Sequence, residues 1–142
     1  MGDQRKDLAR RFLERLGALD ADAATAMVTQ EYEGTAVSEL PLSGEKRVYR
    51  GRDGLRAWID ETVEPWGGYK VERLRFRAYG DVLLVIGANR AAGQRNPFGS
   101  AEHPRTFVCV IRFEGELIRS VHAYVRYEDA LAAEGLSERA KH

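Results

Sequence analysis

The chain has a single cysteine, Cys109, among its 142 residues, so no disulfide can form within it. Neither a CxxC pair nor a cluster of histidines offers metal ligands, and we expect neither a metal ion nor a cofactor. Long hydrophobic runs are also missing, because the longest, residues 82–88, is far too short to cross a bilayer. The charged N-terminal segment lacks the apolar core of a secretion signal. We therefore expect a cytoplasmic protein that does not contact a membrane.

No charge of one sign dominates, since 22 lysines and arginines balance 22 aspartates and glutamates. This balance gives no general attraction to nucleic acid, and we expect no such partner. Hydrophobic residues make up 44% of the chain and charged residues 31%, which is an ordinary globular composition. We expect one domain, residues 1–142, with a sizeable core.

Apolar residues recur at helical spacing in the first half of the chain. They predict a helix over residues 3–18, a shorter one from residue 20 to residue 30, and a third from residue 51 to residue 64. Two weak strands, residues 32–40 and 46–50, separate the second helix from the third.

The second half of the chain is rich in Val, Ile, Phe and Tyr that alternate with polar residues, which predicts four antiparallel strands. The predicted strands are residues 70–79, 82–92, 105–114 and 117–127. The loop between the middle two, residues 93–104, is expected at the mouth of the fold, where it would serve as a lid. Helices first and sheet last indicate an α+β fold: three N-terminal helices packed on a strongly curved antiparallel sheet that forms a cone with an interior.

The register of the first hairpin decides which side chains face that interior. A three-residue loop ending at Gly80, the arrangement that we prefer, fits the left-handed preference of glycine. The inward residues would then be Leu84, Ile86, Ala88 and Arg90. A two-residue loop at 80–81 exchanges the faces, because a slip of one residue reverses every side chain. The inward residues would then include Leu83, Val85 and Asn89.

The last hairpin leaves the same choice for His122 and Tyr124. We favour the outside for both, because Val121 and Ala123 can be buried without cost whereas a buried imidazole needs a partner. The outer face then gathers basic and aromatic residues: Arg73, Arg75, Arg77, Arg112, His122, Tyr124 and Arg126. It is either a solvated charged surface or, since Arg and Tyr are enriched at interfaces, the contact surface of a homodimer.

Four phrases in the sequence, taken in order, resemble the SnoaL-like branch of the nuclear transport factor 2-like superfamily. They are Tyr49-Arg50-Gly51-Arg52-Asp53-Gly54, Gly80-Asp81-Val82, Gly115-Glu116-Leu117-Ile118-Arg119 and residues 130–136. The resemblance covers nearly the whole chain and implies the cone fold with a pocket for a small hydrophobic ligand. The superfamily holds isomerases, cyclases, epoxide hydrolases and non-catalytic domains, so the fold does not decide the activity. The last-strand aspartate of its polyketide cyclases falls on or next to Ala123, so that mechanism does not transfer.

The resemblance places Glu39 where relatives hold a polar pocket group. Desolvation beside Val37 and Leu40 would raise the pKa of Glu39 toward neutrality and suit it to proton transfer. A glutamate near the end of a strand is, in the alternative, simply solvated. In the preferred register the Arg90 side chain also faces the interior, where it would stabilise an oxyanion or pair with Glu39.

Several aromatic residues could form the wall of a pocket for a hydrophobic molecule, although such residues also commonly seal a helix against a sheet. The candidate ligand-binding residues are Tyr32, Tyr49, Trp58, Trp66, Phe107 and His122. The sequence leaves two functions open. One is a cofactor-independent acid–base enzyme of the isomerase, cyclase or hydrolase type. The other is a non-catalytic ligand-binding or dimerisation module.

Overall fold

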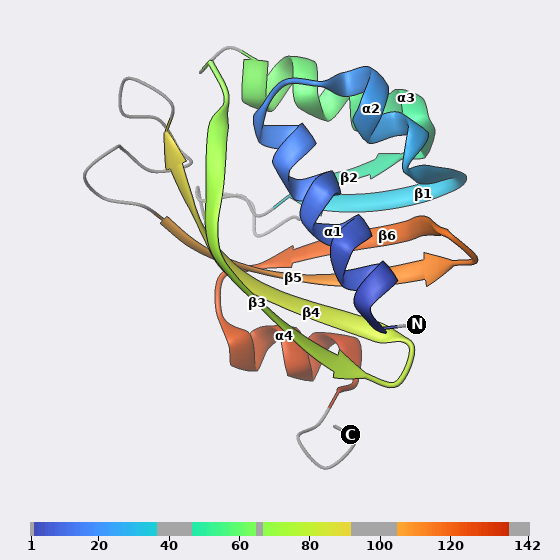
Figure 1. Cartoon of the computed structure of the whole chain (residues 1–142), viewed down its shortest axis with the longest axis vertical. Helices are drawn as coiled ribbons and strands as arrows, with labels where there is room; N and C mark the ends of the chain where they lie inside the picture. Colours follow the sequence, from blue (N-terminus) through green and yellow to red (C-terminus); the bar gives the residue numbers. More distant parts are fainter. Residues whose placement is uncertain (1, 37–46, 65–66, 92–104, 137–142) are drawn as a thin grey trace.

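The computed structural model of the chain shows the predicted α+β architecture, with helices on a curved sheet (Figure 1). The described ranges are residues 2–36, 47–64, 67–91 and 105–136. Three predictions fall outside them: those for Glu39, for Trp66 and for the loop 93–104.

Two helices begin the chain, α1 (Gly2–Gly17) and α2 (Ala21–Ala26). The buried residues of α1 follow helical spacing and form one apolar stripe: Ala9, Phe12, Leu13 and Leu16. Asp20 caps α2, because its carboxylate accepts a hydrogen bond of 3.2 Å from the backbone N–H of Ala23. Both predicted helices are present, but the second ends at Ala26, and residues 28–30, predicted as its end, belong to the next strand.

The next segment is a short hairpin that runs straight into a helix. Its elements are β1 (Val28–Ala36), β2 (Arg47–Arg50), α3 (Gly51–Trp58) and the π-helical turn η1 (Ile59–Val63). Gly51, at φ 72°, allows the abrupt change from strand to helix. Leu55, Ile59 and Val63, four residues apart, are all buried, so the apolar stripe continues through the change of helix type.

The predicted run of four strands is confirmed. The strands are β3 (Tyr69–Tyr79), β4 (Val82–Ala91), β5 (Arg105–Glu114) and β6 (Leu117–Tyr124). The sheet order is β2-β1-β6-β5-β4-β3. β1 runs parallel to β6, so the sheet is mixed, whereas the prediction was a fully antiparallel sheet.

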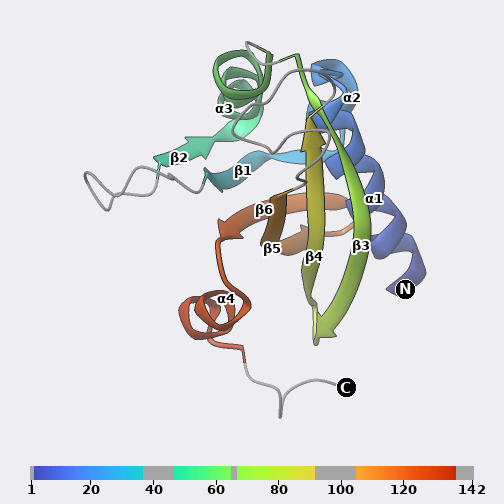
Figure 2. The ribbon, with the colours of Figure 1, turned by 90° about the vertical axis from the view of Figure 1, so that its left-hand side faces the viewer.

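A further helix, α4 (Tyr127–Glu134), follows the sheet and ends at Gly135, which takes the left-handed conformation that terminates many helices. The sequence predicted that the last strand would continue to residue 127 instead. Figures 1 and 2 show α4 on the side of the sheet away from α1. We call the face covered by α1–α3 the inner face and the face covered by α4 the outer face.

The outer face is therefore partly occupied by the chain's own helix. Arg77, predicted as part of a dimer surface, donates a 2.9 Å hydrogen bond to the Tyr127 hydroxyl, and its guanidinium lies 5.1 Å from the centre of that ring. A homodimer through the outer face stays a prediction, and it would have to form beside α4.

The preferred register of the first hairpin is wrong. Tyr79 pairs with Val82 across a two-residue turn in which Gly80 has φ 63°. Leu83 and Val85 belong to the inner core, and Leu84 and Ile86 face the outer core. A two-residue turn with glycine in the left-handed conformation matches the twist of adjacent strands, which explains why the chain adopts it.

Each face has its own apolar core. The inner core is the larger and joins α1, η1 and the sheet through residues such as Phe12, Ile59 and Ile111. The smaller outer core lies under α4 and contains Leu84 and Val110.

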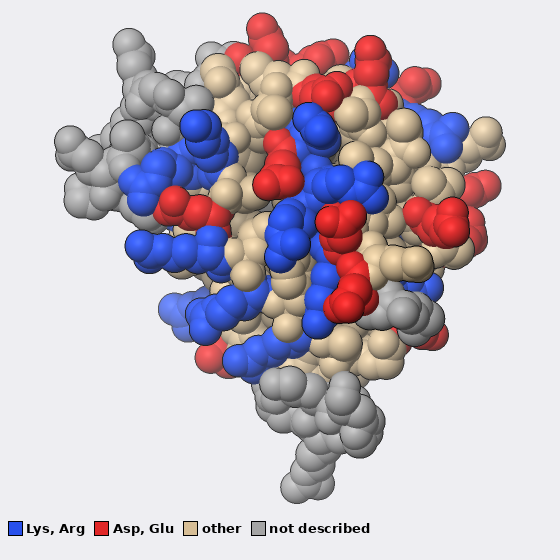
Figure 3. All heavy atoms as spheres, in the orientation of Figure 1, with Lys and Arg blue, Asp and Glu red and all other residues tan. Residues whose placement is uncertain are grey.

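The surface mixes charges of both signs. Lys and Arg gather along one side of the view in Figure 3, while both signs alternate over its middle. The exposed basic residues of β3 are Lys70, Arg73 and Arg75. Among the described helices, none is both long and apolar enough to span a membrane.

Candidate functional site

A cavity of about 430 Å³ lies between the inner face and the helices. Leu13 and Leu16 of α1 and Leu55 of α3 close it on the helix side. Exposed Thr106 and Val125, at the ends of β5 and β6, lie at its opening. Because α1 and α3 cross the curved sheet without filling the space between them, the inner core contains a hollow that is open at one end.

Four of the predicted aromatic residues line this cavity: Tyr32, Tyr49, Trp58 and Phe107. They come from β1, β2, α3 and β5. Gly34, two residues after Tyr32 in β1, pairs with Tyr49 in β2, so the strand register brings Tyr32 and Tyr49 together. Tyr69 of β3 and Tyr124 of β6 add two further aromatic rings that the sequence analysis did not select as ligand-binding residues. A signal for Tyr69 exists, because it follows Gly67-Gly68 as the first residue of an apolar–polar alternation.

The phenols and the thiol in the cavity are uncharged. Burial raises the pKa of Tyr32 and Tyr69 well above the usual phenol value, and the nearby Cys109 thiol adds to that effect. Burial also raises the pKa of Cys109 to about 12. A thiol held in its protonated form is a poor nucleophile, so Cys109 acts here as a small apolar residue.

Tyr32 is 4% exposed and stacks at a tilt on Phe12, with ring centres 6.3 Å apart. Its hydroxyl makes no hydrogen bond with any residue in the described part of the chain. The hydroxyl lies directly over Gly34, where an added Cβ would come within 2.6 Å of it. Gly34 therefore leaves the space that the Tyr32 hydroxyl occupies.

Asn89 of β4 also lines the cavity, opposite Arg105 of β5. Its Oδ1 is shielded from solvent and has no hydrogen-bond partner. Asn89 was inward only in the register that the sequence analysis did not prefer, and this explains why it was missed.

Arg90 does not line the cavity, contrary to the prediction. It pairs with Glu72 of β3, with Nη2 and Oε1 2.8 Å apart, and both side chains are about one-third exposed. The correct register turns Arg90 to the outer side of β4, away from a pocket role. Glu39, its predicted partner, lies outside the described residues.

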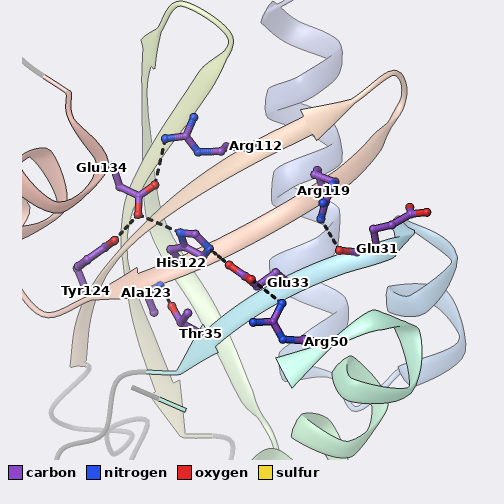
Figure 4. A network of polar contacts seen from close by, with 10 residues as sticks. All are labelled: Glu31, Glu33, Thr35, Arg50, Arg112, Arg119, His122, Ala123, Tyr124 and Glu134. Atoms are coloured by element: carbon purple, nitrogen blue, oxygen red, sulfur yellow. Dashed lines mark hydrogen bonds and ion pairs between the residues drawn. The ribbon is translucent and has the colours of Figure 1, made fainter. Parts of the chain in front are cut away.

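His122 lies on the outer face, as the apolar pattern of β6 predicts, and so does not reach the cavity as a ligand-binding residue (Figure 4). Its Nε2 is 2.9 Å from Glu33 and its Nδ1 is 2.9 Å from Glu134 of α4. Each ring nitrogen of His122 thus faces a carboxylate, one from β1 and one from α4.

Glu134 is the anchor of this outer network. Its side chain is 7% exposed and also accepts hydrogen bonds from Arg112 and from the Tyr124 hydroxyl. Burial, the largest single effect, raises the pKa of Glu134, but the hydrogen bonds from Tyr124 and His122, the charge of His122 and the bond from Arg112 together lower it. The network joins α4 to the sheet with groups that are all paired.

The sequence profile of the SnoaL-like domain matches residues 9–121. The chain belongs to the SnoaL-like domain family. No curated protein sequence matches it significantly. Family membership accounts for the cone-shaped arrangement of helices on a curved sheet around an interior cavity.

Solved structures share this SnoaL-like fold. A protein from Sphaerobacter thermophilus is 24% identical, with a TM-score of 0.58 over 83% of this chain and 92% of that one. A candidate polyketide cyclase from Sinorhizobium meliloti is 14% identical, with a TM-score of 0.63 over 83% and 94%. An NTF2-like protein of unknown function from Burkholderia pseudomallei is 17% identical, with a TM-score of 0.66 over 91% and 95%. At these identities the likeness shows the fold alone.

Proposed function

We propose that this SnoaL-like domain binds a small, largely apolar and uncharged organic molecule in its inner cavity. The observation that carries the proposal is a cavity of about 430 Å³ whose described lining is mostly aliphatic and aromatic. Its volume falls within the range of about 300–1,000 Å³ that is usual for ligand pockets.

The charge of the lining supports an uncharged ligand. Arg105 is the one charged side chain among the described lining residues, and the buried phenols and thiol stay protonated. An apolar ligand that buries roughly 200 Å² of its surface gains about 5 kcal/mol at about 25 cal/mol per Å². A charged ligand would lose hydration without equivalent compensation on these walls.

Acid–base catalysis on the bound molecule, of the isomerase, cyclase or hydrolase type, is the finer alternative. It is favoured by the structural likeness to a candidate polyketide cyclase and depends on Glu39. The described lining contains no Asp, Glu or His that could exchange a proton with the ligand. Once a reacting molecule is found, Glu39→Gln should abolish turnover and leave binding intact if catalysis occurs.

The binding proposal is tested with the neutral fluorescent probe N-phenyl-1-naphthylamine. We expect saturable binding with a blue-shifted emission, because the probe leaves water for an apolar site. Ala123→Trp should weaken binding at least tenfold, since Ala123 lines the cavity and the indole would fill it.

The matched control is Ala132→Trp, which adds the same indole at an exposed position of α4. It should leave the probe affinity unchanged, and circular dichroism should show both variants folded. If the folded Ala123→Trp variant binds the probe as well as the parent does, the cavity is not the binding site and the proposal fails.

A further inference from the structure

We infer that the Tyr32 hydroxyl is the anchoring donor of this site, and that its ligand carries an uncharged acceptor oxygen of the carbonyl class. The inference rests on the proposed function and narrows the ligand from any apolar molecule to a ketone, ester, lactone or quinone. It follows from which polar groups face the cavity and from which of them are already engaged.

Tyr32 combines deep burial with an unengaged hydroxyl. The residue is 4% exposed and lines the cavity, yet its hydroxyl makes no hydrogen bond within the described chain. Buried polar groups in folded proteins nearly always have a partner, so an open hydroxyl at this depth points to a partner that arrives with the ligand.

The protonation state of the Tyr32 hydroxyl shows that it can donate the missing hydrogen bond. Burial raises the pKa of Tyr32, so the hydroxyl keeps its hydrogen at any physiological pH and can donate it. The surrounding aromatic side chains lower the local dielectric constant, which strengthens a hydrogen bond once it forms. A carbonyl oxygen accepts such a bond without bringing a charge into the cavity.

Gly34 supports the same assignment. It stands two residues after Tyr32 on the same face of β1, and any Cβ there would meet the hydroxyl at 2.6 Å. Glycine weakens the interior of a strand, so its presence beneath the phenol keeps the hydroxyl position available at the expense of strand propensity.

Asn89 lines the other end of the cavity, three strand positions away from β1. Its unpartnered atom is Oδ1, which is an acceptor and is shielded from solvent. The assignment of an open donor therefore rests on Tyr32.

The test uses two probes of nearly equal shape, 2-acetylnaphthalene and 2-isopropenylnaphthalene. They differ in a C=O that can only accept a hydrogen bond and a C=CH₂ that cannot. Affinities are measured by displacement of N-phenyl-1-naphthylamine, and the quantity of interest is the ratio of the two affinities. Comparing this ratio between variants cancels the difference in hydration of the probes.

Tyr32→Phe should lower the ketone-to-alkene ratio about 3- to 10-fold, the usual value of one net hydrogen bond, and should leave the alkene affinity within about twofold. The carbonyl stretching band of the bound ketone should also shift to higher frequency in this variant. Asn89→Leu, at the other end, should leave the ratio for this monoketone within about twofold.

Thr29→Val is the matched control, because Thr29 has a buried unpaired hydroxyl that does not line the cavity. Its ratio should equal that of the parent. A ratio unchanged in folded Tyr32→Phe, or one that falls only in Asn89→Leu, overturns this inference while the binding proposal stands. If the fluorescent probe binds in the cavity but the ketone does not displace it, this inference fails; if the fluorescent probe itself does not bind there, the proposed function fails.

Discussion

The inner and outer faces of the sheet carry different kinds of polar group, although the same strands supply both. In β6, Val121 and Ala123 line the neutral cavity, while His122 joins the ionic network under α4. Successive residues of a strand point to opposite faces, so this alternation separates the two chemistries within four residues. Apart from Arg105, the described polar groups of the cavity are neutral and include an open donor at Tyr32, whereas most groups of the outer network are charged and all are paired with one another. We infer that the inner face serves a ligand and that the outer network serves the structure.

The largest expected effect is on the free energy of unfolding, because the inner core is larger than the outer core. Phe12→Ala removes a fully buried ring from the inner core and should lower the free energy of unfolding by about 3–5 kcal/mol. Leu131→Ala on α4, where the side chain is half-buried, should cost about 1 kcal/mol. Urea denaturation of both variants measures the contrast. Equal losses would mean that α4 contributes as much to stability as α1.

Cys109 tests the neutrality of the cavity. Because burial raises its thiol pKa from 9.0 to about 12, the thiolate fraction at pH 8 falls about 1,000-fold. Alkylation by iodoacetamide should therefore be very slow in the native protein and become fast in urea. Mass spectrometry follows the labelling. Rapid labelling of the folded chain would show that solvent and charge reach the inner face.

Removing the anchor of the outer network should have a smaller effect. Glu134→Ala leaves His122, Arg112 and Tyr124 without their shared acceptor and should lower the free energy of unfolding by about 2 kcal/mol. Glu33→Ala removes the other, more exposed carboxylate from His122 and should cost less than about 1 kcal/mol. Thermal denaturation measures both losses of stability. If Glu33→Ala cost more than Glu134→Ala, Glu33 of β1 and not Glu134 of α4 would be the main anchor of the network.

Acid should remove this contribution of Glu134 gradually. Its pKa is lowered in the folded protein, so its share of the stability is complete above the unfolded carboxyl pKa of about 4.3 and is lost as the pH falls through the lower folded value. The stability difference between the parent and Glu134→Gln should therefore shrink as the pH falls below about 4.3. A difference that stays constant over this range would show that Glu134 titrates normally.

The sequence predicted the order of elements well because each strand and helix depends on local pattern. The alternation around Phe107 and Ile111 and the spacing of Leu8, Phe12 and Leu16 are readable without any partner. The register of the first hairpin was not readable, since Gly80 fits a loop of two or three residues. That single choice moved Asn89 into the cavity and Arg90 out of it.

The parts that the sequence did not reveal depend on contacts between distant residues. Glu33, His122 and Glu134 meet only after β1 has joined β6 and α4 has docked. No local signal marks Glu134 as an anchor, because a glutamate near a helix end is usually solvated. The open hydroxyl of Tyr32 was likewise visible only when its surroundings were known, since the sequence identifies an aromatic residue but not what its oxygen contacts.

The parallel pairing of β1 with β6 also sets an order of events during synthesis. Val28 pairs with Ile118, so the strand that carries Tyr32 waits for residues made some 90 positions later. At about 5–20 residues per second, a ribosome needs roughly 5–20 s to supply them. Until then the chain holds α1 and the β1–β2 pair without the central strand that joins them to β5, and the wall formed by Val121 and Ala123 does not exist. The cavity is thus complete only after β6 has been made, and a nascent chain that stops before β6 has no such cavity.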